Sequence, residues 1–218
     1  MAGNPSDSPY KYSMELAEYR LLMEKYSSLT TQIRREAHAL HDSVNQTYGQ
    51  GHPYGFHLDM VVASVWKYGH EVCVAEEDFL PLVFGAYYHD SIEDARLTYN
   101  DVVEAACRLM SRQQAVVAAE IVYARTNDKG RTRSERAGEN YYRGIRQTPY
   151  APFVKLADRL ANTTYSCSQT NSDNLHMKEV YRREMPHFLS AIDAHSDDAR
   201  YRLPAKMTEA LQALVSGS

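Results

Sequence analysis

Several features that mark whole classes of protein are scarce or missing in this sequence. The longest apolar runs, such as residues 80–84, are far shorter than the about 20 residues that a membrane-spanning helix needs. The three cysteines (Cys73, Cys107 and Cys167) form no CxxC pair, and this small, odd number favours reduced thiols in the cytoplasm over a disulfide framework. Residues 1–8 are small and polar, without the apolar stretch of a secretory signal, so we expect a cytoplasmic protein.

An excess of basic residues is also missing. The 24 basic and 28 acidic side chains give a net charge of −4, which argues against a surface track for nucleic acid. A length of 218 residues, 44% of them hydrophobic, is enough for one sizeable core. No repeat and no Pro-, Gly- or Ser-rich linker divides the chain, so we expect a disordered start at residues 1–10 and one domain over 11–215.

Tyrosine is unusually frequent, with 17 residues against five phenylalanines and one tryptophan. An aromatic ring with a polar tip suits cores, interfaces and base-stacking pockets alike, so the count does not choose among them. The early tyrosines could pack within the chain or at the interface of a homo-oligomer, and both readings stay open (Tyr10, Tyr12, Tyr19 and Tyr26).

Hydrophobic residues recur at helical spacing almost throughout the chain. Leu29, Ile33 and Ala37 step by four and continue the pattern of a leading helical region over residues 13–47. Another apolar helix should run from Leu80 through Tyr87 towards His89 and Asp90. Capping signals precede two further helices, at Thr98 and Ser111, and helices are expected over about 58–65, 134–146, 152–165, 175–194 and 204–214. The sequence therefore predicts an all-α fold.

Two segments carry acidic and imidazole side chains at the spacing of a site. His89 and Asp90 are followed by Glu93 and Asp94, so on a helix His89 would stack with Glu93, and Asp90 with Asp94. Burying these carboxylates would be costly without a compensating cation, which a divalent metal would supply. An ordinary acidic helix end is the alternative. Asp158 and Asn162 lie one turn apart in a second segment, for which a surface salt-bridge pattern is the alternative.

Two further features have both a structural and a functional reading. His57 precedes an apolar helix, where a core or capping histidine is the usual role. The polar segment 127–133 carries three cations, Lys129, Arg131 and Arg133, and is expected to be a loop between helices, for which a solvated surface loop is the structural reading.

Taken in order, His57, His89-Asp90 and Asp158 resemble the H…HD…D pattern of the HD-superfamily metal-dependent phosphohydrolases. HDSIED at 89–94 is similar to the HDxxED box of the RelA/SpoT alarmone hydrolases, and VKLADRLANT at 154–163 is similar to their KLADRLxN box. GHPYGFH at 51–57 resembles their GxPYxxHP stretch, although Leu58 replaces the final proline. The resemblance implies a single HD-domain helical bundle with a central metal cleft.

The resemblance also implies roles for particular residues. His57, His89, Asp90 and Asp158 would be metal ligands, and the family's usual ion is Mn²⁺. Glu93 and Asp94 would be the catalytic acidic pair, with the general base left open between them. Asn162 would contact the nucleotide, and the cations of segment 127–133 would hold a pyrophosphate group.

The implied reaction is removal of the 3′-pyrophosphate from guanosine tetra- or pentaphosphate, (p)ppGpp, by a metal-activated water. Segment 46–51 lacks the Arg-Lys pair with which that family holds guanine, although Tyr48 could stack on a base there. Two other readings therefore stay open: an HD nucleotidase for another (deoxy)nucleotide or nucleoside 3′-phosphate, and a non-catalytic HD-fold nucleotide-binding protein. In each case the expected partner is a small nucleotide, with no nucleic acid and no membrane.

Overall fold

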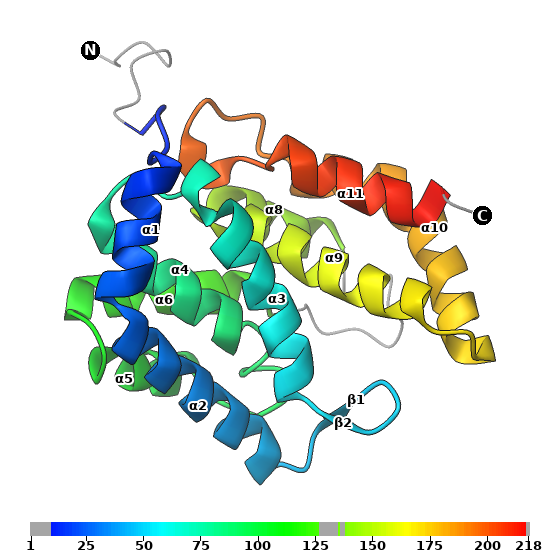
Figure 1. Cartoon of the computed structure of the whole chain (residues 1–218), viewed down its shortest axis with the longest axis horizontal. Coiled ribbons are helices and arrows are strands. Elements are labelled where there is room, and N and C mark those ends of the chain that lie inside the picture. Colours follow the sequence, from blue (N-terminus) through cyan, green and yellow to red (C-terminus); the bar gives the residue numbers. More distant parts are fainter. Residues whose placement is uncertain (1–9, 127–134, 136–137, 217–218) are drawn as a thin grey trace.

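The computed structural model describes residues 10–126, 135 and 138–216, which form ten α-helices and one two-stranded hairpin (Figure 1). The prediction of an all-α fold is confirmed. The helices are α1 (Leu16–Lys25), α2 (Ser27–Ser43), α3 (Gly55–Tyr68), α4 (Glu76–Tyr88), α5 (Tyr99–Cys107), α6 (Arg112–Ala124), α8 (Glu139–Gln147), α9 (Ala151–Ser168), α10 (Ser172–Ile192) and α11 (Ala205–Ser216). Short 3₁₀ turns cover Gly69–Glu71 and Ala199–Tyr201. The expected disordered start falls almost wholly outside the described residues.

The leading helical region is not one helix but two. Tyr26 separates α1 from α2 with φ −101° and ψ 11°, outside the helical range. Its ring stacks on Phe79 at a centroid distance of 5.7 Å, and its hydroxyl donates to Glu76 at the start of α4. These contacts fix the bend between α1 and α2 against α4, which the helical period of the sequence alone does not reveal.

The two predicted capping boxes are present. Asp101 N donates to Thr98 Oγ1 at 3.2 Å, and Gln114 N donates to Ser111 Oγ at 3.3 Å. In each box the third helical residue also accepts from the cap residue's backbone N–H, so two donors at each helix start are satisfied. Helices α5 and α6 therefore begin where the sequence indicates.

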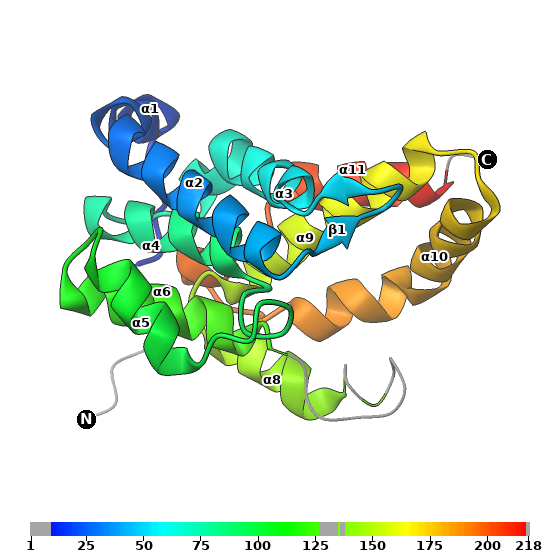
Figure 2. The same cartoon turned by 90° about the horizontal axis from the view of Figure 1, so that it is seen from below.

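Three helices, α3, α4 and α9, form the interior of the bundle. Helix α9 packs against α3, α10 and α11, while α4 packs against α6, α3 and α2. Figures 1 and 2 show α9 between the α3 side of the molecule and the α10–α11 side. Most residues of α4 and α9 are buried. In α4 they form a continuous apolar run from Phe79 to Tyr88, whereas the buried residues of α9 include the polar Asp158 and Arg159.

A close approach of α2 sets the position of the start of α3. A Cβ added to Gly55 would lie 2.4 Å from Nδ1 of His38, a ring of α2, so a larger residue would force the two helices apart. Helix α3 begins at Gly55, and His57 therefore lies in its first turn. The glycine allows this turn to approach the neighbouring helix closely.

The hairpin before α3 was not predicted. Strands β1 (Thr47–Tyr48) and β2 (His52–Pro53) pair in antiparallel register, with Tyr48 opposite His52. Gly49 adopts φ +56°, and a Cβ there would clash with the hydroxyl of Tyr165 at 2.1 Å. Strands of two residues have no detectable alternation in sequence. The hairpin places the Tyr48 ring beside the start of α3.

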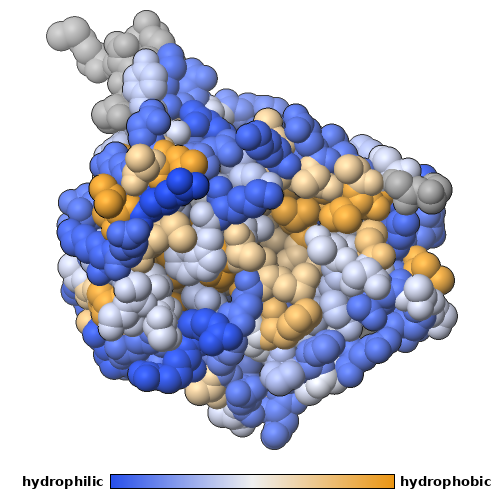
Figure 3. Space-filling view, viewed as in Figure 1, coloured by the Kyte–Doolittle hydropathy of each residue, from blue (hydrophilic) through white to orange (hydrophobic). Residues whose placement is uncertain are grey.

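An apolar groove runs along one face, where Figure 3 shows hydrophobic residues between α3 and α11. It has a volume of about 610 Å³, and among its lining residues Lys67 is the one with a charge. The wall comes from α3, α9 and α11, with Met60, Leu160 and Leu214 among its larger side chains. None of the His or Asp residues singled out above lines this groove. No helix in the described part of the chain is long and apolar enough to cross a membrane.

Candidate metal centre

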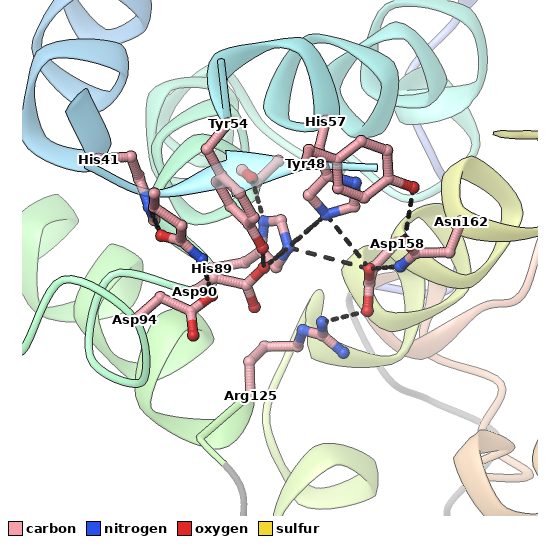
Figure 4. A network of polar contacts seen from close by, with 12 residues as sticks. His41, Tyr48, Tyr54, His57, His89, Asp90, Asp94, Arg125, Asp158 and Asn162 are labelled. Carbon is pink, nitrogen blue, oxygen red and sulfur yellow. Dashed lines mark hydrogen bonds and ion pairs between the residues drawn. The ribbon is translucent and has the colours of Figure 1, made fainter. Parts of the chain in front are cut away.

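Four predicted ligands come together from three helices (Figure 4). His57 lies in the first turn of α3, His89 and Asp90 directly follow α4, and Asp158 lies in the middle of α9. His57 and His89 are each 1% exposed and Asp158 is 8% exposed. Three interior elements far apart in sequence thus direct two imidazoles and two carboxylates to one point.

The ligand atoms of these residues are close to one another. His57 Nε2 lies 3.3 Å from His89 Nε2, 3.8 Å from Asp90 Oδ2 and 3.5 Å from Asp158 Oδ1. His89 Nε2 lies 2.9 Å from Asp90 Oδ2 and 4.0 Å from Asp158 Oδ1. Atoms bound about 2.1 Å from one divalent ion are separated by roughly 3 to 4 Å. The ligand atoms of His57, His89 and Asp90 all lie within 4.8 Å of one another, so these three could hold one ion, and Asp158 adds an oxygen on the side of the two histidines.

The tautomer of His89 also favours a metal. Its Nδ1 lies 2.8 Å from the carbonyl oxygen of Ala86, which can only accept, so Nδ1 carries a proton. The Nε2 of a neutral His89 therefore presents a lone pair towards Nε2 of His57 and the carboxylate of Asp90. Electron-rich atoms gathered in this way need a cation between them, either a proton or a metal ion. The donor set, two nitrogens and two oxygens without thiolate, suits Mn²⁺ or a similar divalent ion.

The pKa values of the four groups agree with this environment. Burial, and next to it the charge of His89, lower the pKa of His57 to about 4, so His57 is neutral at physiological pH. For Asp90 and Asp158, burial favours the protonated form, but the cationic and histidine neighbours outweigh it and lower both pKa values. Burial also opposes the charged form of His89, but the charge and hydrogen bond of Asp90 outweigh it and raise the pKa of His89.

We expect Mn²⁺ affinity to rise with pH until the raised pKa of His89 is passed. Below that pKa a proton occupies the position of the metal and must leave when the ion binds, which predicts about a tenfold change in affinity per pH unit for one proton. Titration calorimetry between about pH 5.5 and about pH 8.5 measures this dependence, and buffers of different ionisation enthalpy count the released proton. An affinity that stays constant over this range would contradict the assignment of His89 as a ligand.

Three side chains other than the two histidines contact the carboxylate of Asp158. Arg125 Nη2 donates to its Oδ2 at 2.7 Å, and Lys155 Nζ lies 3.4 Å from the same oxygen. Asn162 Nδ2 donates to its Oδ1 at 2.6 Å. Asn162, which was predicted to contact the nucleotide, therefore touches a ligand directly. Sequence reasoning missed Arg125, although a cation directly after the helix of residues 115–124 was a usable signal.

Two tyrosines line the same centre. The hydroxyl of Tyr54 donates to Asp90 Oδ2 at 2.5 Å, and the ring of Tyr48 stacks on His57 at a centroid distance of 4.8 Å. The hydroxyl of Tyr48 donates to Asn162 Oδ1 at 2.8 Å. One face of the Tyr48 ring is thus engaged by a predicted ligand. The hydrogen bond from Tyr48 to Asn162 connects the hairpin to α9 over the site.

The acidic pair does not lie on a helix as predicted. Helix α4 ends at Tyr88, and residues 89–94 form turns in which Asp94 N donates to Asp90 O at 2.9 Å. This single helical turn still brings Asp94 to the same side as Asp90. Glu93 and Asp94 are both exposed on this turn. The sequence spacing of the pair was correct, but the helix ends before it, at Tyr88.

Asp94 is held by a chain of polar groups that sequence reasoning did not find. Gln46 Nε2 donates to Asp94 Oδ2 at 2.7 Å, and His41 Nδ1 donates to Gln46 Oε1 at 2.5 Å. His41 is fully buried and stacks on Tyr54. Loss of water in the cleft, and next to it the charge of Asp90, raise the pKa of Asp94. Asp94 therefore has both a fixed orientation and an increased affinity for a proton.

The predicted phosphate-binding cations, Lys129, Arg131 and Arg133, lie outside the described residues. A scan against models of protein families finds none that matches this chain, and a search of curated proteins finds no relative.

Proposed function

We propose that this protein is a metal-dependent phosphohydrolase that acts on a nucleotide. The observation that carries the proposal is the convergence of His57, His89, Asp90 and Asp158, with a hydrogen-bonded carboxylate, Asp94, beside them. A divalent ion there, for which we propose Mn²⁺, would lower the pKa of a bound water and polarise a phosphoryl oxygen. The resemblance to the HD-superfamily phosphohydrolases supports the same assignment.

The acidic pair would handle the proton of the reaction. We assign the general base to Asp94, because its raised pKa and its hydrogen bond from Gln46 suit a group that must accept a proton in a fixed direction. Water attacks the phosphorus, its proton passes to Asp94, and the bond from phosphorus to the 3′ oxygen breaks. The leaving oxygen then takes up a proton. Glu93, one residue earlier on the same turn, is the second catalytic candidate.

Replacement of Asp94 by asparagine is expected to lower kcat by about a hundredfold to ten-thousandfold, the usual contribution of a general base. Mn²⁺ affinity should change little, since Asp94 is not among the proposed ligands. Glu93→Gln is the matched variant, because it removes the neighbouring charge and keeps the size of the side chain. Equal kcat values for Asp94→Asn and the wild type would contradict the assignment, and a larger loss in Glu93→Gln would move the base to Glu93.

For the substrate, we propose (p)ppGpp with release of its 3′-pyrophosphate. Asn162 and Tyr48 would contact the nucleotide, and Lys129, Arg131 and Arg133 would hold the pyrophosphate. The main alternative is an HD nucleotidase for another (deoxy)nucleotide or nucleoside 3′-phosphate. One observation favours this alternative: Gln46, in the segment where a guanine-binding cation was expected, donates to Asp94.

A panel of nucleotides with added Mn²⁺ tests these readings. Pyrophosphate released from ppGpp supports the first reading, whereas inactivity on ppGpp with orthophosphate released from another nucleotide supports the alternative. No hydrolysis of any nucleotide, together with nucleotide binding, would indicate a non-catalytic HD-fold protein. Such a result would overturn the proposed function.

We further propose a cytoplasmic location and a small-molecule partner. Cys73, Cys107 and Cys167 are all free thiols, which suits a reducing compartment. A homo-oligomer remains a proposal that size measurement in solution tests directly.

A further inference from the structure

Arg125 is a buried cation that uses one of its three nitrogens. It directly follows α6, is 3% exposed, and donates through Nη2 to Asp158 Oδ2 at 2.7 Å. Its Nε and Nη1 are also shielded from water, and neither has a hydrogen-bond partner among the described residues. Figure 4 shows the guanidinium reaching Asp158 from the side of the cleft opposite His57.

Buried donors without acceptors are rare because the lost hydration is not replaced, and the loss is greater for a charged group. The salt bridge to Asp158 explains why a positive charge is present. It does not explain why the charged group is a guanidinium, because the ammonium group of Lys155, a simple point charge, contacts the same carboxylate oxygen. Among the described residues these two nitrogens lack an acceptor, and a ligand that displaces the atoms covering them would supply one.

The charges around the centre identify the class of that ligand. Two carboxylates, Asp90 and Asp158, interact with two permanent cations, Arg125 and Lys155. A divalent ion bound there makes this group of side chains positive overall. An anion with several oxygens would restore the balance, and a phosphate has the geometry that guanidinium donors match.

We infer that Arg125 binds phosphoryl oxygens of the substrate through its free N–H groups while Nη2 stays on Asp158. The inference rests on the proposed function, since it places the phosphate next to the proposed metal ligands. Asp158 would then contact both the ion and Arg125, and its hydrogen bond orients the guanidinium that receives the phosphate. The guanidinium thereby couples the metal site to the phosphate site.

Inorganic phosphate is the probe for this inference, titrated calorimetrically into the Mn²⁺-loaded full chain. The variant Arg125→Lys keeps the charge and removes the planar set of donors. It should weaken phosphate binding by about tenfold to a hundredfold, with Mn²⁺ affinity changed by less than about threefold. The matched control is Lys155→Met, which removes the other cation from the same oxygen of Asp158 and should weaken phosphate binding less than Arg125→Lys does.

A second measurement needs no variant. In wild-type protein labelled with ¹⁵N at arginine, the Nε–H resonance of Arg125 should shift on addition of phosphate to the Mn²⁺-loaded form. An unshifted resonance, no phosphate binding by the wild type, or phosphate affinity unchanged in Arg125→Lys would overturn the inference. Equal losses of Mn²⁺ and phosphate affinity would reduce Arg125 to a residue that positions Asp158. Phosphate binding through Arg125 in a protein that hydrolyses no nucleotide would instead overturn the proposed function.

Discussion

Replacement of Asp90 by alanine is expected to abolish Mn²⁺ binding and to lower nucleotide hydrolysis by at least about four orders of magnitude. A bound ion supplies several kcal/mol of charge stabilisation in such reactions, and about 1.4 kcal/mol corresponds to a tenfold change in rate. Asp90 contributes the carboxylate oxygen nearest to His89, at 2.9 Å, and the same oxygen lies 3.8 Å from His57. Without Asp90, Asp158 is the one carboxylate left among the four proposed ligands, so the negative charge of the ligand set is halved.

The matched control is Asp197→Ala, which removes an exposed carboxylate from the loop between α10 and α11. It should bind Mn²⁺ and turn over substrate like the wild type. Turnover is measured with the nucleotide that the panel identifies, and Mn²⁺ binding by calorimetry. Equal turnover in Asp90→Ala and the wild type would reject the proposed site.

Loss of Asp158 should destabilise the fold even without metal. Arg125 is almost fully buried, and Asp158→Ala removes the acceptor of the hydrogen bond from its Nη2. Removing one partner of a buried ion pair typically costs about 3–5 kcal/mol in the free energy of unfolding, because a charge remains buried without compensation. We expect a loss of this size in urea unfolding of the metal-free protein.

The double variant Asp158→Ala, Arg125→Leu tests the cause. It removes both charges, so part of the stability lost in Asp158→Ala should return. A single variant as stable as the wild type would contradict the ion-pair account. So would a double variant that is no more stable than the single one.

The fold class was predictable because helical periodicity is a local property. The four later helices expected from apolar spacing are close to α8, α9, α10 and α11, and the capping residues Thr98 and Ser111 mark the true starts of α5 and α6. The bend at Tyr26 was not predictable in this way. It depends on contacts with Glu76 and Phe79, which lie about 50 residues further along the chain.

The candidate ligands were predictable from their motifs, whereas the groups that hold them were not. His57, His89, Asp90 and Asp158 stand in segments with a recognisable order. Arg125, Gln46 and His41 carry no local pattern, since each acts through one contact made by the tertiary fold. The end of α4 before the acidic pair was likewise hidden, because the residue types after Tyr88 are compatible with a continued helix.

The structure shows what a few of the 17 tyrosines contact. Tyr19 is fully buried and its hydroxyl donates to the carbonyl of Val65, a core role. Tyr54 and Tyr48 contact Asp90 and His57, so these two belong to the proposed centre.

The central claim is that one divalent ion binds between His57, His89, Asp90 and Asp158. A crystal of the wild-type protein soaked with Mn²⁺, measured at a wavelength where manganese scatters anomalously, tests it most directly. The account predicts one strong anomalous peak about 2.1 Å from Nε2 of both histidines and from an oxygen of both aspartates. A fully soaked crystal with no peak among these four side chains, or with its strongest peak elsewhere, would contradict the account.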